Sequence, residues 1–122
     1  MQKRALLLFL LLQTWVSTIL VAQSFTKITN GPVVNTPGDS RSVNWIDVNN
    51  DDLLDLMITN GPAGGQNNFL YLNDGAGGFT AVVNDTIVKD GKPSDGATWA
   101  DTDNDGDLDC FVANWYNFIG LY

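Results

Sequence analysis

The chain contains a short loop in which acidic side chains are close enough together to bind a metal ion. Five aspartates and one glycine fall within the nine residues 101–109. Two carboxylates about 4 Å apart repel each other by about 4 kcal/mol at an effective dielectric constant of about 20, and a bound divalent cation would relieve this repulsion. Oxygen ligands without histidine or cysteine favour Ca²⁺ over zinc or copper. Residues 101–109 are therefore a candidate calcium site.

A second acidic loop lies upstream, with oxygen-bearing side chains at the same offsets. It covers residues 47–55, and the two loops begin 54 positions apart. The same register relates residues 24–60 to residues 78–114 without a gap and includes a tryptophan two positions before each loop. Self-similarity at a fixed period of about this length is typical of solenoids, propellers and arrays. We therefore interpret the two loops as equivalent parts of one sequence repeat.

The N-terminal residues have the pattern of a secretory signal peptide. A basic start at residues 3–4 is followed by a continuous apolar run at residues 5–12 and a mixed stretch that ends near Ala22. Polar residues interrupt the apolar stretch after residue 12, which favours cleavage over retention as a membrane anchor. We predict a signal peptide at residues 1–22, a secreted, extracellular or cell-surface location, and no membrane insertion after cleavage.

The composition argues against several functions. The formal net charge is −8, and removal of the two basic residues in the leader would change it to −10. Nucleic acid is not an expected partner, because its phosphates would be repelled. The chain has no histidine, which excludes a Ser–His or Cys–His pair within this segment. Its one cysteine, Cys110, aligns with Leu56 of the first repeat and is predicted to be a buried apolar residue.

The apolar runs predict an all-β fold. A run of strand length follows each acidic loop, a shorter one precedes it, and a glycine-rich turn separates two further runs that would form a hairpin. No stretch has helical periodicity. Each period would therefore supply about four short strands, as a β-propeller blade requires. The expected strands are residues 44–46, 54–59, 68–72, 79–83, 98–100 and 108–113.

Two motifs carry a resemblance to a known repeat family. One is Trp99 followed by Asp-x-Asp-x-Asp-Gly-x-x-Asp at residues 101–109, and the other is Asn-Phe-Leu-Tyr-Leu-Asn-x-Gly-x-Gly-x-Phe at residues 68–79. Together they resemble the FG-GAP/VCBS repeats of integrin-alpha-like propellers. The resemblance covers nearly all of residues 23–122, as one repeat at 24–77 and part of a second at 78–122.

The resemblance implies a seven-bladed β-propeller with Ca²⁺ in the loops between strands, located outside the cell, with adhesion, carbohydrate-binding or scaffold roles. The chain would form about two four-stranded blades of an incomplete propeller. Two blades cannot close a ring, so we interpret the chain as the N-terminal fragment of a longer protein that supplies the remaining blades. Self-assembly of a short chain into a ring is the alternative.

Alternate positions of each loop would supply the calcium ligands. In the second loop these are the carboxylates of Asp101, Asp103, Asp105 and Asp109 and the backbone carbonyl of Asp107. In the first loop they are the side chains of Asp47, Asn49, Asp51 and Asp55 and the carbonyl of Leu53. Asn49 is neutral, and Asp52 replaces Gly106, whose positive φ turns the chain around the ion. The second site is therefore expected to bind Ca²⁺ more tightly.

Other loops of similar spacing fit less well. An EF-hand needs glutamate at position twelve, where the two loops have Ile58 and Val112. A dockerin module also uses repeated aspartate loops, but these lead into helices rather than into β-type runs. A further alternative is that the aspartates only cap turns and bind no ion.

Three classes of function stay open at this point. The first is a binding or adhesion module for an extracellular protein or carbohydrate ligand. The second is a propeller enzyme acting on polysaccharide, a lyase or hydrolase, with its catalytic residues outside this segment. The third is a purely structural repeat region. Trp115 and Tyr116 follow the second strand of the second repeat and would either stack on sugar rings or pack against the next blade.

Overall fold

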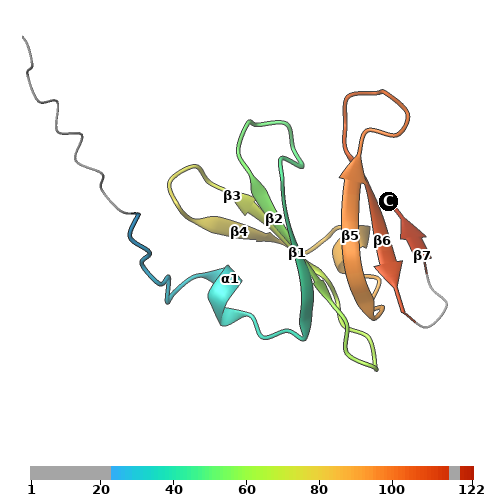
Figure 1. Cartoon of the computed structure of the whole chain (residues 1–122), viewed down its shortest axis with the longest axis horizontal. Coiled ribbons are helices and arrows are strands. Elements are labelled where there is room, and N and C mark those ends of the chain that lie inside the picture. The colour runs from blue at the N-terminus through green and yellow to red at the C-terminus, as the bar shows by residue number, and fades with distance from the viewer. Residues whose placement is uncertain (1–22, 116–118) are drawn as a thin grey trace, which may run out of the picture.

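In the computed structural model, the described part of the chain forms two antiparallel sheets (Figure 1). The structure describes residues 23–115 and 119–122, so the predicted signal peptide lies outside the described residues. The first sheet contains β1 (Ser40–Ile46), β2 (Asp55–Asn60), β3 (Phe69–Asn73) and β4 (Phe79–Val82). The second contains β5 (Ser94–Ala100), β6 (Asp109–Asn114) and β7 (Ile119–Leu121). Consecutive strands are neighbours in both sheets, as in propeller blades, and the all-β prediction is confirmed.

The sequence repeat is reproduced in the strands. β1 and β5 have equal lengths and begin 54 positions apart, as do β2 and β6. The register of the β1–β2 pair shifts between Ser40 and Ser42, and that of the β5–β6 pair shifts between Ser94 and Gly96, at the equivalent position. The first sheet also takes in β4, which lies beyond residue 77, so the sheet and the sequence repeat have different boundaries.

The third strand of the second sheet comes earlier than the period predicts. Leu56 pairs with Tyr71 in the first sheet, whereas its equivalent Cys110 exchanges two backbone hydrogen bonds, of 2.8 and 2.9 Å, with Tyr122. The connection between the second and third strands is therefore three residues shorter in the second sheet. Leu121 and Tyr122 therefore occupy the strand positions of Leu70 and Tyr71.

Two short helical turns were not expected from the sequence. They are α1 (Pro32–Asn35) and the 3₁₀ turn η1 (Thr86–Val88), which begin 54 positions apart. Pro32 occupies the first turn of α1, where its missing N–H costs nothing, and the Asp85 carboxylate caps η1 by accepting the Ile87 N–H at 3.0 Å. Each turn is too short to show the hydrophobic periodicity of a helix. Only Pro32 and Asp85, at the starts of the turns, could have predicted them from the sequence.

The hydrophobic core lies between the two sheets. Met57 and Leu70 from the first sheet pack with Cys110 and Val112 from the second, and Ile87 and Val88 of η1 complete the buried cluster. This face-to-face packing of two apolar sheet faces is how layered β folds bury their strands. Cys110 is 1% exposed, which confirms the prediction that it is a core residue.

Contacts at the β2–β3 connection also join the sheets. The Arg41 guanidinium lies 5.8 Å from the Trp115 ring centroid and donates a 2.9 Å hydrogen bond to the Gly61 carbonyl. A Cβ at Gly61 would approach the Ser94 carbonyl oxygen to 2.8 Å, so only glycine allows this approach. Trp115 therefore takes part in a contact between the sheets. Within residues 23–115 and 119–122, no helix is long and apolar enough to cross a membrane.

Candidate metal centre

The two acidic loops occupy equivalent places at the same end of the two sheets (Figure 1). The first loop (residues 47–55) leads from β1 into β2, and the second loop (residues 101–109) leads from β5 into β6. Each loop closes an antiparallel pair, so the strand register holds its two ends together. The second loop is exposed up to Leu108.

The backbone follows the same path in both loops. Position four has a positive φ in each, 58° at Asn50 and 62° at Asn104. Position six is also left-handed, with φ of 65° at Asp52 and 96° at Gly106. The expectation that Asp52 adopts a conformation that glycine prefers is therefore confirmed. These two left-handed residues turn the intervening backbone N–H groups toward the first aspartate of the loop.

That first aspartate holds the loop closed. Asp47 accepts hydrogen bonds from the N–H groups of Asp51 at 3.1 Å and Asp52 at 2.8 Å. In the second loop Asp101 accepts them from Asp105 and Gly106, both at 3.1 Å. Two backbone donors offset part of the carboxylate's negative charge and leave further lone pairs on its oxygens for an ion.

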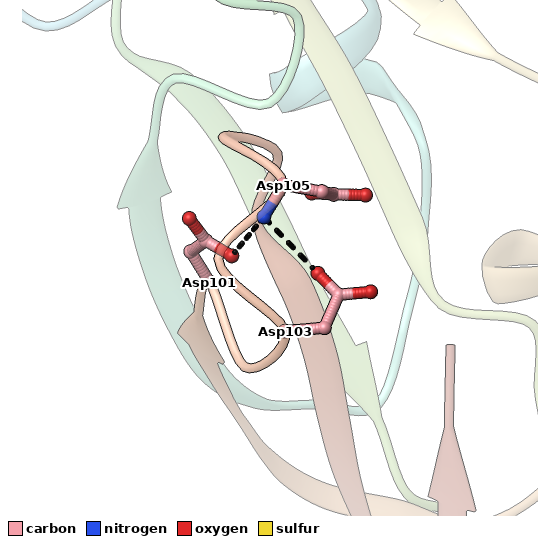
Figure 2. Close-up of side chains that lie close together, drawn as sticks. All are labelled: Asp101, Asp103 and Asp105. Atoms are coloured by element: carbon pink, nitrogen blue, oxygen red, sulfur yellow. Dashed lines mark hydrogen bonds between the residues drawn. The ribbon is translucent and has the colours of Figure 1, made fainter.

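Three carboxylates converge in the second loop. One oxygen from each of Asp101, Asp103 and Asp105 lies within 4.8 Å of the other two, and all three side chains are exposed. Figure 2 shows the oxygens of Asp101 and Asp103 directed at the backbone nitrogen of Asp105, which donates to both, at 3.1 and 3.3 Å. The sequence-predicted ligands at positions one, three and five are therefore brought together.

The first loop has an amide where the second has the middle carboxylate. Asn49 donates its Nδ2 hydrogen to the Asp51 carboxylate at 3.0 Å. Asp51 also accepts the Leu53 N–H at 2.9 Å, as Asp105 accepts the Asp107 N–H at 2.9 Å. Asn49 is neutral, whereas its equivalent Asp103 is charged. Positions one, three and five of the first loop therefore carry fewer negative charges than the same positions of the second loop.

The aspartates at position nine make different contacts. Asp55 is fully buried, and its two oxygens accept the N–H groups of Val48 at 3.1 Å and Asn73 at 2.8 Å. Asp109 is partly exposed and accepts both the N–H and the hydroxyl of Thr102. The hydrogen bond from the Thr102 hydroxyl is the main cause that lowers the pKa of Asp109 below its ordinary value, and the hydrogen bond from the Thr102 N–H lowers it further. Both aspartates tie the start of a loop to its end, and neither belongs to the converging group.

Position seven distinguishes the loops again. Leu53 is half-buried, whereas the Asp107 side chain is exposed and accepts a 2.8 Å hydrogen bond from Asn50 of the first loop. From the sequence, both residues were expected to act only through their backbone carbonyls. Asn50 and Asn73 were not expected to take part, although both hold the site together. Asn73 lies in the glycine-containing motif at residues 68–79, which was the available signal.

The donor set fits a hard divalent cation. The converging atoms are carboxylate oxygens, the ligands that Ca²⁺ prefers, and water can complete the coordination of an exposed site. Cys110 follows the second loop directly, but burial raises its pKa to about 12. It is therefore a neutral thiol at physiological pH, not a thiolate ligand.

Comparison with protein families agrees with this geometry. Residues 47–112 match the family model of the FG-GAP-like repeat. The chain belongs to the FG-GAP-like repeat family. The matched FG-GAP-like segment begins at the first residue of the first loop and ends within β6, after the second loop. It identifies the two sheets as parts of a β-propeller-like module. No curated protein and no solved structure matches the chain.

Proposed function

We propose that this FG-GAP-like chain is a calcium-binding β-propeller module, secreted or displayed at the cell surface, that binds an extracellular protein or carbohydrate ligand. The convergence of Asp101, Asp103 and Asp105 carries the proposal. Ca²⁺ bound there would neutralise carboxylates that otherwise repel one another. The second loop would be the tighter site and the first loop the weaker one.

The contacts of each position support a separate role for it. The side chains at positions one, three and five would bind the ion, with the Asp107 carbonyl as a further ligand in the second loop. Asp109 holds the loop closed through Thr102, and its second oxygen stays available to the ion. In the first loop the corresponding groups are Asp47, Asn49, Asp51, Asp55 and the carbonyl of Leu53. Calcium would thereby stiffen the end of the sheets where the loops lie, where a ligand would bind.

Thermal unfolding tests calcium binding. An ion at a hundred times its dissociation constant stabilises the folded state by about 2.7 kcal/mol. Since 1 kcal/mol corresponds to roughly 4–8 °C for a domain of this size, millimolar calcium should raise the melting temperature by about 10–20 °C over EGTA. Asp103→Ala should remove most of this rise, and magnesium should not replace calcium. Equal melting temperatures in calcium and EGTA would refute the proposal.

Ligand binding and secretion need separate tests. A glycan array and a panel of extracellular matrix proteins, probed with and without chelator, should yield a ligand whose retention depends on calcium. Expression with the native leader should release a protein that begins near Gln23, as N-terminal sequencing would detect. Retention of the leader in the product would contradict the predicted cleavage.

A further inference from the structure

The chain contains two Asn-Gly pairs, and the fold places them in opposite environments. An asparagine that precedes a glycine is prone to spontaneous deamidation, because glycine has no side chain to hinder attack by its backbone nitrogen on the asparagine amide carbon. The pairs are Asn30-Gly31, which precedes α1, and Asn60-Gly61, whose asparagine ends β2. The surroundings of each pair therefore decide whether it can react.

The fold blocks the reaction at the second pair. Asn60 is fully buried; its Nδ2 donates to the Asn67 carbonyl at 2.8 Å, and its Oδ1 accepts the Ser40 hydroxyl at 3.1 Å. The Gly61 N–H, whose nitrogen would have to attack, donates to the Asp39 carbonyl at 2.9 Å. Attack would break all three hydrogen bonds inside the protein, so it requires local unfolding.

The first pair is open to reaction. Asn30 and Gly31 are both exposed, and neither the Asn30 side chain nor the Gly31 N–H makes a hydrogen bond to another residue that the structure describes. Gly31 has φ of 112° and ψ of 166°, a backbone conformation that essentially only glycine adopts. The start of α1 thus requires the residue type that makes the preceding asparagine reactive.

The exposure of Asn30 does not depend on what packs against the first sheet. Its equivalent in the second repeat is Asn84, which precedes η1 as Asn30 precedes α1. Ile87 and Val88 of η1 are buried in the core between the sheets, yet Asn84 stays exposed. The position before the helical turn is therefore open to solvent even where a neighbouring sheet covers the turn. Asn84 is followed by Asp85 rather than glycine, so it is an internal control.

We propose that Asn30 is a site of spontaneous deamidation, whereas the fold protects Asn60. The Gly31 nitrogen gives its proton to hydroxide and bonds to Asn30 Cγ; the Cγ–Nδ2 bond then breaks, and ammonia leaves. Water opens the resulting succinimide at either carbonyl and yields aspartate or isoaspartate. Both products add one negative charge. Isoaspartate also lengthens the main chain directly before Gly31, whose carbonyl accepts the Val34 and Asn35 N–H groups. The proposal rests neither on calcium binding nor on secretion.

Peptide mapping by mass spectrometry tests the proposal on the full chain after incubation for several days at pH 8. The peptide with Asn30 should gain the mass difference between an amide and an acid at least about tenfold faster than the peptide with Asn60, which reacts only through local unfolding. In urea the two rates should converge, because unfolding frees the Asn60 side chain and the Gly61 nitrogen. Asn84 should react more slowly than Asn30 in both conditions, because the Asp85 side chain hinders attack.

Asn30→Gln is the matched control variant. It keeps the amide at an exposed position but would have to close a six-membered ring, so deamidation at this position should stop, and circular dichroism should show an unchanged fold. Equal rates for Asn30 and Asn60 in buffer would overturn the proposal. So would an Asn30 that keeps its amide in buffer while it reacts in urea, or an Asn84 that reacts as fast as Asn30.

Discussion

Asn50 in the first loop donates a 2.8 Å hydrogen bond to the carboxylate of Asp107 in the second loop. The two residues are 57 positions apart and come from different sheets. The bond joins the two candidate ion sites directly, because Asp107 occupies the position whose backbone carbonyl is an expected ligand. A substitution in one loop can therefore alter the stability of the other loop.

A double-mutant cycle measures this link. Asn50→Gly removes the side chain but keeps a residue that tolerates the positive φ, and Asp107→Ala removes the acceptor. We expect a coupling free energy of about 0.5–1 kcal/mol in urea unfolding, as for an exposed hydrogen bond. Asn104→Gly, at the equivalent left-handed position of the second loop, is the matched control and should not couple to Asp107→Ala. Additive effects of Asn50→Gly and Asp107→Ala would contradict the link.

The folded protein should be less stable with Asp52 in this left-handed conformation than with a glycine at the same position. Its φ of 65° suits glycine, which the second loop has at position six. Asp52→Gly should raise the free energy of unfolding by about 0.5 kcal/mol in EGTA, because relief of strain exceeds the entropy that glycine adds to the unfolded chain. Asp52→Asn removes the charge but keeps a side chain, so it separates the effect of the charge from the effect of backbone strain. Gly106→Ala should destabilise by about 1 kcal/mol or more; a neutral result there would count against backbone strain.

Asp55 should matter for folding even without calcium. It is fully buried and accepts two backbone N–H groups, which Asp55→Ala would leave without their acceptor. We expect a loss of about 2–4 kcal/mol in the free energy of unfolding in EGTA. The exposed Asp103→Ala should cost little or nothing in EGTA and should show its effect only when calcium is present. Equal losses for the two variants in EGTA would show that Asp55 has no separate structural role.

The second loop should bind calcium more tightly than the first. Its converging group carries three carboxylates, whereas the first loop has an amide at the middle position. In isothermal titration calorimetry, Asp101→Ala should weaken the tighter binding event by more than about tenfold, or about 1.4 kcal/mol. Asp47→Ala should affect mainly the weaker event. The order of affinities is wrong if Asp47→Ala causes the larger loss.

Cys110 should be unreactive in the folded protein. Burial raises its pKa to about 12, so the folded thiol stays protonated near pH 8, where an exposed thiol with an ordinary value near 9 is partly thiolate. Reaction with a disulfide reagent at pH 8 should be at least about a hundredfold slower in buffer than in urea. The unfolded thiol ionises first as the pH rises, so this residue lowers stability between about pH 9 and about pH 12. Rapid labelling of the folded chain would place Cys110 outside the core.

The local features of this chain could be predicted from its residues. The two acidic loops, the strands that follow them and the repeat that relates them all depend on neighbours in the sequence. The positive φ at Asp52 and Gly106 also follows from the loop pattern. Even the core position of Cys110 followed from its alignment with Leu56, because equivalent positions of a repeat occupy equivalent environments.

Other features depended on how the sheets pack. The sequence could not indicate that Asn50 reaches Asp107, that Asp55 is buried against Asn73, or which face of each sheet packs against the other sheet. The residues of each such contact are separated along the chain, and strand register and sheet packing alone bring them together. The sequence by itself therefore determined which groups can bind an ion and where the chain turns. The tertiary structure decided which of these groups meet, because burial and contact arise between segments that have no local signal for each other.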